Sequence, residues 1–415
     1  MAQKKSISWE ALCEAGDLGD DYELDLSTTN VTVCGGGNAA HVGAAMFAKQ
    51  GCKTNMYLSL PKEAEKMKAG IAEGGIECQQ TADDNHMTYV GSPLVSADPS
   101  ITKDSDVVVI LAPAFAHESI CRETKPFLKK GAIIGTLPAH GGFDLVARHA
   151  LDEKIDEVVV FGTVGLPWTT RIIEYGKKVE VYSTKANLRM NFHPRVPKVP
   201  ALTLLSTMFI GTTFQMGNDY LECTLWPVNN VIHPGILYGR WKDWDGIPVA
   251  EKPLFYNGVD DFTASKLEGM SDEIQATAKA AQKELGVELA VPSLKEFLEN
   301  SYGDLIPDRT SLKTIFRTSP AYQGLTHPMT ESESGFSPDF KNRYLTEDLP
   351  HGLAVVRGIA ALVEVPTPCI DEVLTWAQNA CGQSYLVDGK MTGNDISHSG
   401  VPQRFGFEEI SELIF

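Results

Sequence analysis

The chain has few of the features that mark membrane, metal-binding or disulfide-linked proteins. No segment approaches the ~20 consecutive apolar residues that a membrane-spanning helix needs. Its 8 cysteines include no C-x-x-C pair, so their spacing indicates neither a zinc site nor a disulfide framework. The first residues lack the apolar core of a signal peptide. We therefore expect a cytoplasmic protein with no membrane partner and no bound metal.

Positive charge is scarce as well. The 415 residues include 36 lysines and arginines against 54 aspartates and glutamates, which makes the net charge −18. An acidic surface of this kind argues against nucleic acid and anionic membranes as partners. An anionic cofactor would have to be held by local positive groups, such as helix N-termini and a few arginines.

A glycine-rich turn is the clearest motif in the chain. A short β-branched run at 31–34 stops at three glycines, and an alanine-rich stretch with helical spacing follows. The order Gly-x-Gly-x-x-Ala between a strand and a helix fits the turn that holds the pyrophosphate of a dinucleotide. The alternative is a tight strand-to-helix turn that binds nothing. On the first interpretation, the cofactor-binding residues are Gly35, Gly36, Gly37, Asn38 and Ala39.

The acidic residue that usually binds the cofactor's ribose is missing. It is expected about 20 positions after the glycine turn. The second predicted strand, at 53–59, ends without aspartate or glutamate. This stretch therefore leaves the choice between NADH and NADPH open.

Strand and helix patterns alternate from residue 31 to about residue 218. Continuous apolar runs such as 106–112 are typical of parallel strands that are covered on both faces. Helices between such strands predict a doubly wound parallel sheet, that is, an α/β Rossmann domain at 31–218 with its ligand at the carboxyl ends of the strands. His117 and His140 follow two of these ends, and we interpret each as a loop or capping histidine rather than a catalytic one.

Three stretches of the chain do not follow this alternation of strands and helices. Residues 1–30 are acidic and rich in turn residues, and we expect an N-terminal surface extension with a short helix at 9–14. The proline-rich stretch 194–200 predicts a loop. From 219 onward the alternation stops, and an all-α catalytic domain is predicted at 219–415, which would leave a cleft for a small molecule beside the first domain. Its candidate helices are 219–238, 260–285, 293–301, 309–316, 351–363 and 369–380.

Two polar clusters of the second domain could carry chemistry. Asn229 and His233 are four residues apart and so share one face of a predicted helix. The histidine could exchange a proton while a hydride moves, or it could be a structural residue beside a kink caused by Pro234. Arg343 could clamp a carboxylate or phosphate, and Asp348 could orient a histidine. Alternatively, this second polar cluster only caps the next helix.

Eight short motifs are spread in order from about residue 31 to the end of the chain: Cys34-Gly-Gly-Gly-Asn38, Pro113-Ala-Phe-Ala-His-Glu118, Leu166-Pro-Trp168, His233-Pro234, Leu237-Tyr-Gly-Arg-Trp241, Gly324-Leu-Thr-His-Pro328, Asn342-Arg-Tyr-Leu-Thr-Glu-Asp348 and Tyr385-Leu-Val-Asp-Gly389. Together they resemble the opine dehydrogenase family, in particular the octopine and tauropine dehydrogenases of invertebrates. The resemblance implies NADH as cofactor and reductive condensation of pyruvate with an amino acid, which regenerates NAD⁺ in anaerobic glycolysis. We expect the protein to be a monomer.

The resemblance also assigns roles to single residues. His233 matches the catalytic histidine of the family, Asp348 matches its acidic partner, and Arg343 matches an arginine that reaches the cofactor pyrophosphate and helps to close the cleft. The glycine turn matches the cofactor loop, and the family generally uses NADH although it lacks the usual ribose acid. The resemblance adds Pro113 and Phe115 as cofactor contacts. It also adds Asn229, His140 and Trp168 as substrate contacts.

The chain departs from the octopine-type pattern at two places. Val164-Gly165 stands where those enzymes have Glu-Thr before Leu-Pro-Trp, and His140 replaces a glutamine. In the octopine enzyme these positions lie near the arginine substrate, and loss of the carboxylate removes the natural partner of a guanidinium. We therefore predict a small neutral amino substrate such as taurine, alanine, glycine or β-alanine, with His140 suited to a sulfonate.

Three other functions stay open at this stage. The chain could reduce a 2-keto or β-hydroxy acid without an amine. It could be an amino acid or phosphonate-type synthase that uses the fold without a nicotinamide, or a non-catalytic NADH-binding sensor. The presence of both His233 and Asp348 argues against the sensor.

Overall fold

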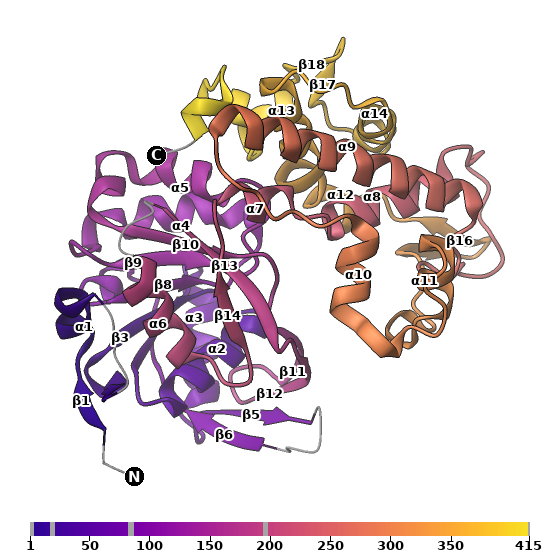
Figure 1. Cartoon of the computed structure of the whole chain (residues 1–415). Coiled ribbons are helices and arrows are strands. Elements are labelled where there is room, and N and C mark those ends of the chain that lie inside the picture. Colours follow the sequence, from indigo (N-terminus) through magenta and orange to yellow (C-terminus); the bar gives the residue numbers. More distant parts are fainter. Residues whose placement is uncertain (1–3, 17–20, 82–86, 194–197, 414–415) are drawn as a thin grey trace. The chain divides into compact units, whose positions relative to one another are not determined.

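The computed structural model describes residues 4–16, 21–81, 87–193 and 198–413, and the chain forms two compact units (Figure 1). Unit 1 comprises Met1–Ala139 and Val146–Cys223, and unit 2 comprises His140–Leu145 and Thr224–Phe415. The predicted change of architecture at 218–219 lies close to the last point where the chain passes from one unit to the other. The short exchange at His140–Leu145 has no counterpart in the sequence prediction.

Eight strands form the main sheet of unit 1. The neighbours β10 and β13 pair antiparallel, and the other neighbouring pairs described for this sheet are parallel. Parallel strands between helices are buried on both faces, and every residue of β8 is buried accordingly. The predicted α/β Rossmann fold class is confirmed. In spatial order the strands are β14 (Thr213–Met216), β13 (Asn187–His193), β10 (Val159–Thr163), β9 (Ile133–Thr136), β8 (Val107–Ile110), β3 (Asn30–Cys34), β4 (Lys53–Tyr57) and β7 (Leu94–Ser96).

Helix α2 (Asn38–Lys49) packs against strands of two sheets. Besides β3 and β4 of the main sheet, it contacts a second sheet of four strands. A helix that is covered on all sides must be apolar all round, which explains the run of alanines and the complete burial of Ala40, Ala44 and Phe47. In spatial order the second sheet contains β11 (Trp168–Glu174), β12 (Lys178–Thr184), β5 (Ile76–Gln80) and β6 (Met87–Gly91).

The N-terminal segment is more than a surface extension, which corrects the prediction. Strand β1 (Lys5–Ile7) pairs with β2 (Tyr22–Leu24), and helix α1 (Trp9–Ala15) forms at the predicted place. The side chains of Trp9 and Leu12 belong to the hydrophobic core of unit 1. Two apolar side chains one turn apart thus anchor an otherwise acidic segment.

The predicted loop at 194–200 can be compared with the structure only at residues 198–200, because residues 194–197 lie outside the described residues. Residues 198–200 belong to helix α6 (Lys198–Met208) rather than to a loop. A first helical turn tolerates Pro200, because the amide hydrogen that proline lacks would have no acceptor there. The other helices that follow strands of this fold are α3 (Pro61–Ile71), α4 (His117–Thr124) and α5 (Phe143–Leu151).

Unit 2 is mainly helical, as predicted, and its long helix α9 is plain in Figure 1. The predicted helix at 219–238 is in fact two helices, because Trp226-Pro227-Val228 interrupts it. Two short hairpins, β15 (Met329–Ser332) with β16 (Gly335–Pro338) and β17 (Leu386–Val387) with β18 (Lys390–Met391), were not expected in an all-α domain. The helices are α7 (Leu221–Leu225), at the passage between the units, α8 (Asn229–Trp241), α9 (Asp261–Leu285), α10 (Leu294–Tyr302), α11 (Leu312–Thr318), α12 (Arg343–Thr346), α13 (Ala354–Leu362) and α14 (Pro368–Cys381).

Local signals set the ends of α9. The Asp260 side chain accepts a hydrogen bond from the N–H of Thr263 at the start, and Gly286 ends the helix with φ of +64°.

None of the helices that the structure describes combines the length and the apolar character that a membrane span requires.

Candidate active site

The glycine turn between β3 and α2 has the shape that a dinucleotide requires. Gly35 has φ of +127°, and a Cβ there would lie 2.4 Å from the carbonyl oxygen of Leu111, so only glycine fits. Gly37 is the N-cap of α2, no side chain caps the helix, and a Cβ at Gly37 would meet nothing within 4 Å. Uncapped N–H groups beside open space can hold a pyrophosphate, which the helix dipole also favours. These residues therefore fit a dinucleotide cofactor.

His41 and Asn38 fix the geometry of this turn. The Nδ1–H of His41 donates to the carbonyl of Gly37 at 2.8 Å, and its Nε2 accepts from the N–H of Gly176 at 2.9 Å. Burial lowers the pKa of His41, which keeps the ring neutral and able to accept. The side-chain oxygen of Asn38 accepts from the N–H of Ile172 at 2.8 Å. The backbone N–H groups of Asn38 and its neighbour Ala39, rather than the Asn38 oxygen, are thus available to a cofactor.

A carboxylate does lie beside the glycine turn, although the end of β4 supplies none. A Cβ at Gly36 would lie 2.7 Å from the Tyr175 hydroxyl and 3.7 Å from a Glu63 carboxylate oxygen. Glu63 is in the first turn of α3. The Tyr175 hydroxyl is buried and has no hydrogen-bond partner among the described residues. Neither residue was predicted from the sequence, because neither stands at the end of β4, where the ribose-binding acid is expected.

The other predicted residues of unit 1 fall into an exposed pair and two buried rings. Pro113 and Phe115 lie just after β8, and Phe115 is 73% exposed, so both are open to a ligand. Trp168 is 3% exposed and stacks on Phe209 with ring centroids 5.5 Å apart, so its ring faces are used in the core, and its role as a substrate contact stays a prediction. His117 is buried and its Nε2–H donates to the carbonyl of Ala112 at 3.0 Å. Burial lowers the pKa of His117 to about 4, which suits the structural interpretation.

The predicted histidine and aspartate of unit 2 lie in direct contact. The Nδ1–H of His233, on α8, donates to a carboxylate oxygen of Asp348 at 2.7 Å. Its Nε2 lies 3.0 Å from the hydroxyl of Tyr256. The ring of Tyr344 stacks on the imidazole, with centroids 3.7 Å apart and 16° between the planes. Because the imidazole is also buried, these neighbours fix its tautomer and its orientation.

Tyr256 and Tyr344 are the residues of this cluster that sequence reasoning missed. Tyr344 directly follows Arg343 in one of the eight motifs, so it could have been proposed as a site residue. Tyr256 lies in none of these motifs. Burial raises the pKa of Tyr256, so its hydroxyl stays protonated. The hydroxyl can therefore donate to Nε2 while the Nδ1–H is held by the aspartate.

The side chain of Asp348 does not cap the helical turn that follows it. It lies between α12 and a π-helical turn at Leu349–Leu353, and it makes no side-chain capping bond to that turn. The residue that does cap a helix is Asn342, whose side chain accepts from the N–H of Tyr344 at 3.2 Å. Single π-helical turns occur frequently at functional sites, and this one directly follows the partner of His233.

Three more predicted residues belong to unit 2, and two of them, Arg343 and Asn229, lie close in sequence to members of this cluster. Arg343 is 73% exposed and forms an ion pair of 2.7 Å with Glu347. Asn229 is the exposed first residue of α8, one turn before His233. His140 is half-buried in the short segment that unit 2 takes from the middle of the chain. The roles of these three residues stay predictions.

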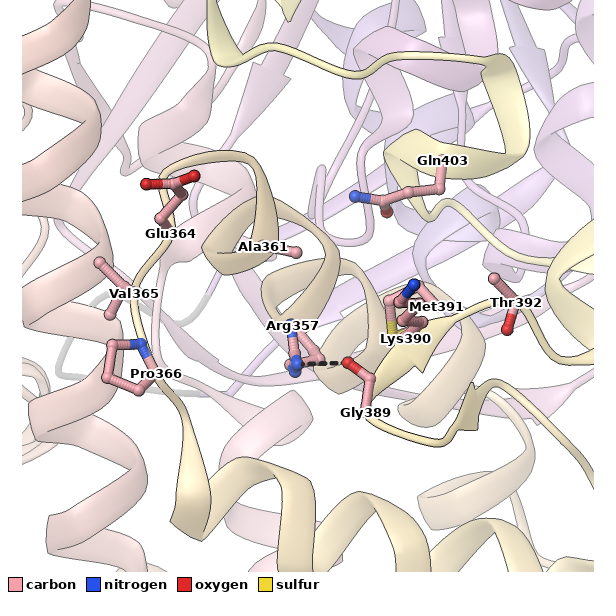
Figure 2. A pocket seen from close by; sticks show the side chains of 10 residues that line it. All are labelled: Arg357, Ala361, Glu364, Val365, Pro366, Gly389, Lys390, Met391, Thr392 and Gln403. Carbon is pink, nitrogen blue, oxygen red and sulfur yellow. Dashed lines mark hydrogen bonds between the residues drawn. The ribbon is translucent and has the colours of Figure 1, made fainter.

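Unit 2 also has a surface pocket of about 680 Å³, which Figure 2 shows. The Arg357 guanidinium donates to the carbonyl of Gly389 at 3.0 Å and to Asp371 at 2.5 Å, so its charge is already balanced. None of the predicted site residues lines the pocket, and we assign it no function. Within the described part of the chain, no group of three or more histidine, cysteine, aspartate or glutamate residues could hold a metal ion.

Known proteins with a similar sequence include dehydrogenases that use NAD or NADP. Residues 216–381 match the family model of the NAD/NADP octopine/nopaline dehydrogenase alpha-helical domain. An opine dehydrogenase of Haliotis discus hannai is 37% identical over 401 residues, which cover 92% of this chain and 98% of the relative. A tauropine dehydrogenase of Arabella iricolor is 36% identical, and the match covers 92% of this chain and 99% of the relative.

The fold is shared with a solved structure of octopine dehydrogenase that contains NADH and L-arginine. Its TM-score is 0.89 at 35% sequence identity, and the match covers 93% of this chain and 98% of the other. Similarity at this level over nearly the whole length of each protein confirms the resemblance that the eight sequence motifs predicted. The chain therefore belongs to the opine dehydrogenase family, whose members are NAD-dependent oxidoreductases.

Proposed function

We propose that this protein catalyses the NADH-dependent condensation of pyruvate with a small amino substrate to an N-(1-carboxyethyl) amino acid. The observation that carries the proposal is His233, held between the Asp348 carboxylate and the Tyr256 hydroxyl in a chain whose glycine turn fits a dinucleotide. The keto acid and the amine form an imine with loss of one water, and the imine then takes up a hydride and a proton. The reaction regenerates NAD⁺ for glycolysis when oxygen is limiting.

His233 is the acid and base of this reaction. Because Asp348 accepts a hydrogen bond from Nδ1–H, proton exchange takes place at Nε2, and the carboxylate stabilises the imidazolium form. In that form, Nε2–H donates to the carbonyl oxygen of pyruvate and makes the carbonyl carbon more open to attack by the amine. The same nitrogen then helps the oxygen to leave as water.

Tyr256 prepares Nε2 for the substrate. In the absence of substrate its hydroxyl occupies the hydrogen-bonding position of Nε2 at 3.0 Å. A pyruvate oxygen replaces that hydroxyl, so the imidazole is already oriented when the substrate arrives and little reorganisation is needed. The stacked ring of Tyr344 holds the imidazole plane during the exchange.

Most of the cofactor-binding residues in this proposal belong to unit 1. When bound, NADH supplies the hydride. The uncapped N–H groups of α2 hold its pyrophosphate, and Glu63, with Tyr175, takes the place of the strand-end acid that binds ribose hydroxyls. A carboxylate there repels a 2′-phosphate, which favours NADH over NADPH. Pro113, Phe115 and Arg343 are the further cofactor contacts that we propose.

The amino substrate is small and has no cationic side chain. Residues 164 and 165 are valine and glycine, so they offer no carboxylate to pair with a guanidinium. Taurine, alanine, glycine and β-alanine fit this requirement. His140, Asn229 and Trp168 are the contacts that we propose for this substrate.

Mass spectrometry of the products tests the proposed function. The protein is incubated with NADH, pyruvate and each of the four amines in turn. The expected product has the combined mass of pyruvate and amine, minus one water and plus two hydrogens. Formation of lactate at the same rate with and without amine would instead indicate a 2-keto acid reductase. NADH binding without consumption of either substrate would indicate a sensor.

A further inference from the structure

A lysine near the carboxyl end of β10, Lys185, is used by no part of the proposed mechanism. Lys185 lies between β12 and β13, and its N–H donates to the carbonyl of Pro167 at 2.8 Å. Its ammonium folds back over the segment that follows β10, because a Cβ at Gly165 would lie 3.2 Å from Lys185 Nζ. The carboxyl ends of parallel strands are where open α/β sheets bind their ligands.

The segment under this ammonium is well fixed. The hydroxyl of Thr163 donates to the carbonyl of Gly165 at 2.8 Å, and the N–H of Val164 donates to the carbonyl of Arg189 at 3.2 Å. A side chain at position 165 would meet both the ammonium and Leu188, at 3.2 and 3.4 Å. Glycine at this position therefore leaves the room that the lysine occupies.

The ammonium of Lys185 makes no hydrogen bond or ion pair with any residue that the structure describes. Nearby lysines behave differently. Lys178, on β12, pairs with Glu77 at 3.3 Å, and Lys177 pairs with Glu73 and Glu174. Lys185 is an exposed residue, so a ligand can reach it. Neighbouring residues displace part of the water around its ammonium, and this desolvation lowers the pKa of the group. In a chain with a net charge of −18, a cation left without a carboxylate is available to an anion from solution.

We infer that the Lys185 ammonium binds the anionic group of the amino substrate, a carboxylate or a sulfonate, at the carboxyl end of β10. This inference rests on the proposed function and narrows it. Val164-Gly165 offers no carboxylate, and the ammonium of Lys185 lies beside Gly165. An amine with an anionic group gains affinity from this contact, whereas an uncharged analogue does not make the contact.

Steady-state kinetics of Lys185→Met test the inference. The assay uses the amine that the wild-type protein turns over best, its uncharged amide or sulfonamide analogue, pyruvate and NADH. Loss of one charge-assisted hydrogen bond should raise KM for the anionic amine about 10- to 100-fold. The values for the uncharged analogue, pyruvate and NADH should stay as in the wild type. Lys185→Arg should restore most of the affinity, and Lys178→Met is the control.

Each other result overturns the inference in a recognisable way. An unchanged KM for the anionic amine, or an equal rise for its uncharged analogue, shows that Lys185 does not bind the anionic group of the amine. A rise in KM for pyruvate alone shows that the anion is the keto acid. A wild-type protein that consumes NADH with none of the amines overturns the proposed function, and the inference with it.

Discussion

His233 is the side chain on which the other groups of the candidate site converge. A carboxylate, a phenol and a stacked ring each contact a different part of its imidazole. Each contact has a separate physical consequence, because the first sets the tautomer, the second occupies the free nitrogen and the third fixes the plane. Single substitutions can therefore separate chemistry from structure.

Replacing His233 by alanine should lower kcat by about 10²- to 10⁴-fold, because the reaction loses its acid and base. The affinity for NADH should stay as in the wild type, since the glycine turn belongs to unit 1. Steady-state NADH oxidation and a fluorescence titration with NADH measure the two quantities.

Asp348→Asn should reduce kcat as well, because the amide no longer stabilises the imidazolium. Near-normal turnover of either variant would remove the histidine from the mechanism.

Tyr256→Phe should lower kcat about 3- to 10-fold, because Nε2 loses the hydrogen bond that orients it before the substrate binds. The matched control is Tyr322→Phe. Tyr322 stacks on Tyr256 with centroids 4.2 Å apart and belongs to the same aromatic cluster. A purely structural role for Tyr256 would appear as a lower melting temperature with kcat unchanged.

His117 should make the stability of unit 1 depend on pH. Its pKa is lowered from 6.5 to about 4, so the unfolded chain binds a proton that the folded chain does not. The free energy of unfolding should therefore fall as pH drops from about 6.5 to 4, by up to ~1.4 kcal/mol per pH unit from this group. Urea unfolding of His117→Gln should show a slope smaller by that amount. Replacement of the exposed His398 by glutamine is the control, and an identical slope in all three proteins would contradict the assignment.

At the scale of elements, the turn between β3 and α2 contains two glycines with different roles. Gly35 has a backbone conformation that other residues rarely adopt, and Gly37 does not. Gly35→Ala should destabilise unit 1 by about 2–5 kcal/mol, because its Cβ would lie 2.4 Å from the Leu111 carbonyl oxygen at a φ of +127°. Gly37→Ala meets nothing within 4 Å and should fold normally. Its methyl group would nevertheless occupy space that the pyrophosphate needs.

The two variants therefore separate folding from cofactor binding. Thermal unfolding and NADH titration should show a destabilised Gly35→Ala protein and a stable Gly37→Ala protein with at least about 10-fold weaker NADH binding. Unchanged NADH affinity in the Gly37 variant would mean that the pyrophosphate does not lie against this turn.

Elements with a strong local pattern could be predicted from the sequence, and elements that depend on distant pairing could not. Strands such as β8 and the helix α2 follow from continuous apolar runs and from glycine–alanine spacing. The second sheet pairs β12 with β5, which are about a hundred residues apart in sequence, and no local pattern encodes that register. The break at Pro227 could have been read from the sequence as a helix end.

The candidate site was predictable to a similar extent. His233 and Asp348 were identified through motifs, and the structure brings them together although they are 115 residues apart in sequence. Tyr256 and Glu63 could not be found in this way. A tyrosine in a loop and a glutamate in a helical first turn are common residues, and their importance comes only from the groups beside them.

The whole molecule consists of two compact units, and cofactor binding should stabilise them unequally. Ligand present at 100 times its dissociation constant adds about 2.7 kcal/mol to the state that binds it. Hydrogen exchange with and without NADH should show added protection in peptides that cover β3, α2 and the start of α3. Helices α10 and α11 of unit 2 should show no comparable gain. Protection confined to unit 2 would contradict the assignment of the cofactor to the glycine turn.

The most direct test of the proposed function is NADH oxidation by the whole protein with pyruvate alone and with pyruvate plus an amine. Taurine, alanine, glycine and β-alanine are each added at saturating concentration. We predict that pyruvate alone gives little oxidation, that at least one of these amines raises the rate by about 100-fold or more, and that His233→Ala abolishes the increase. Equal rates with and without every amine would contradict the account.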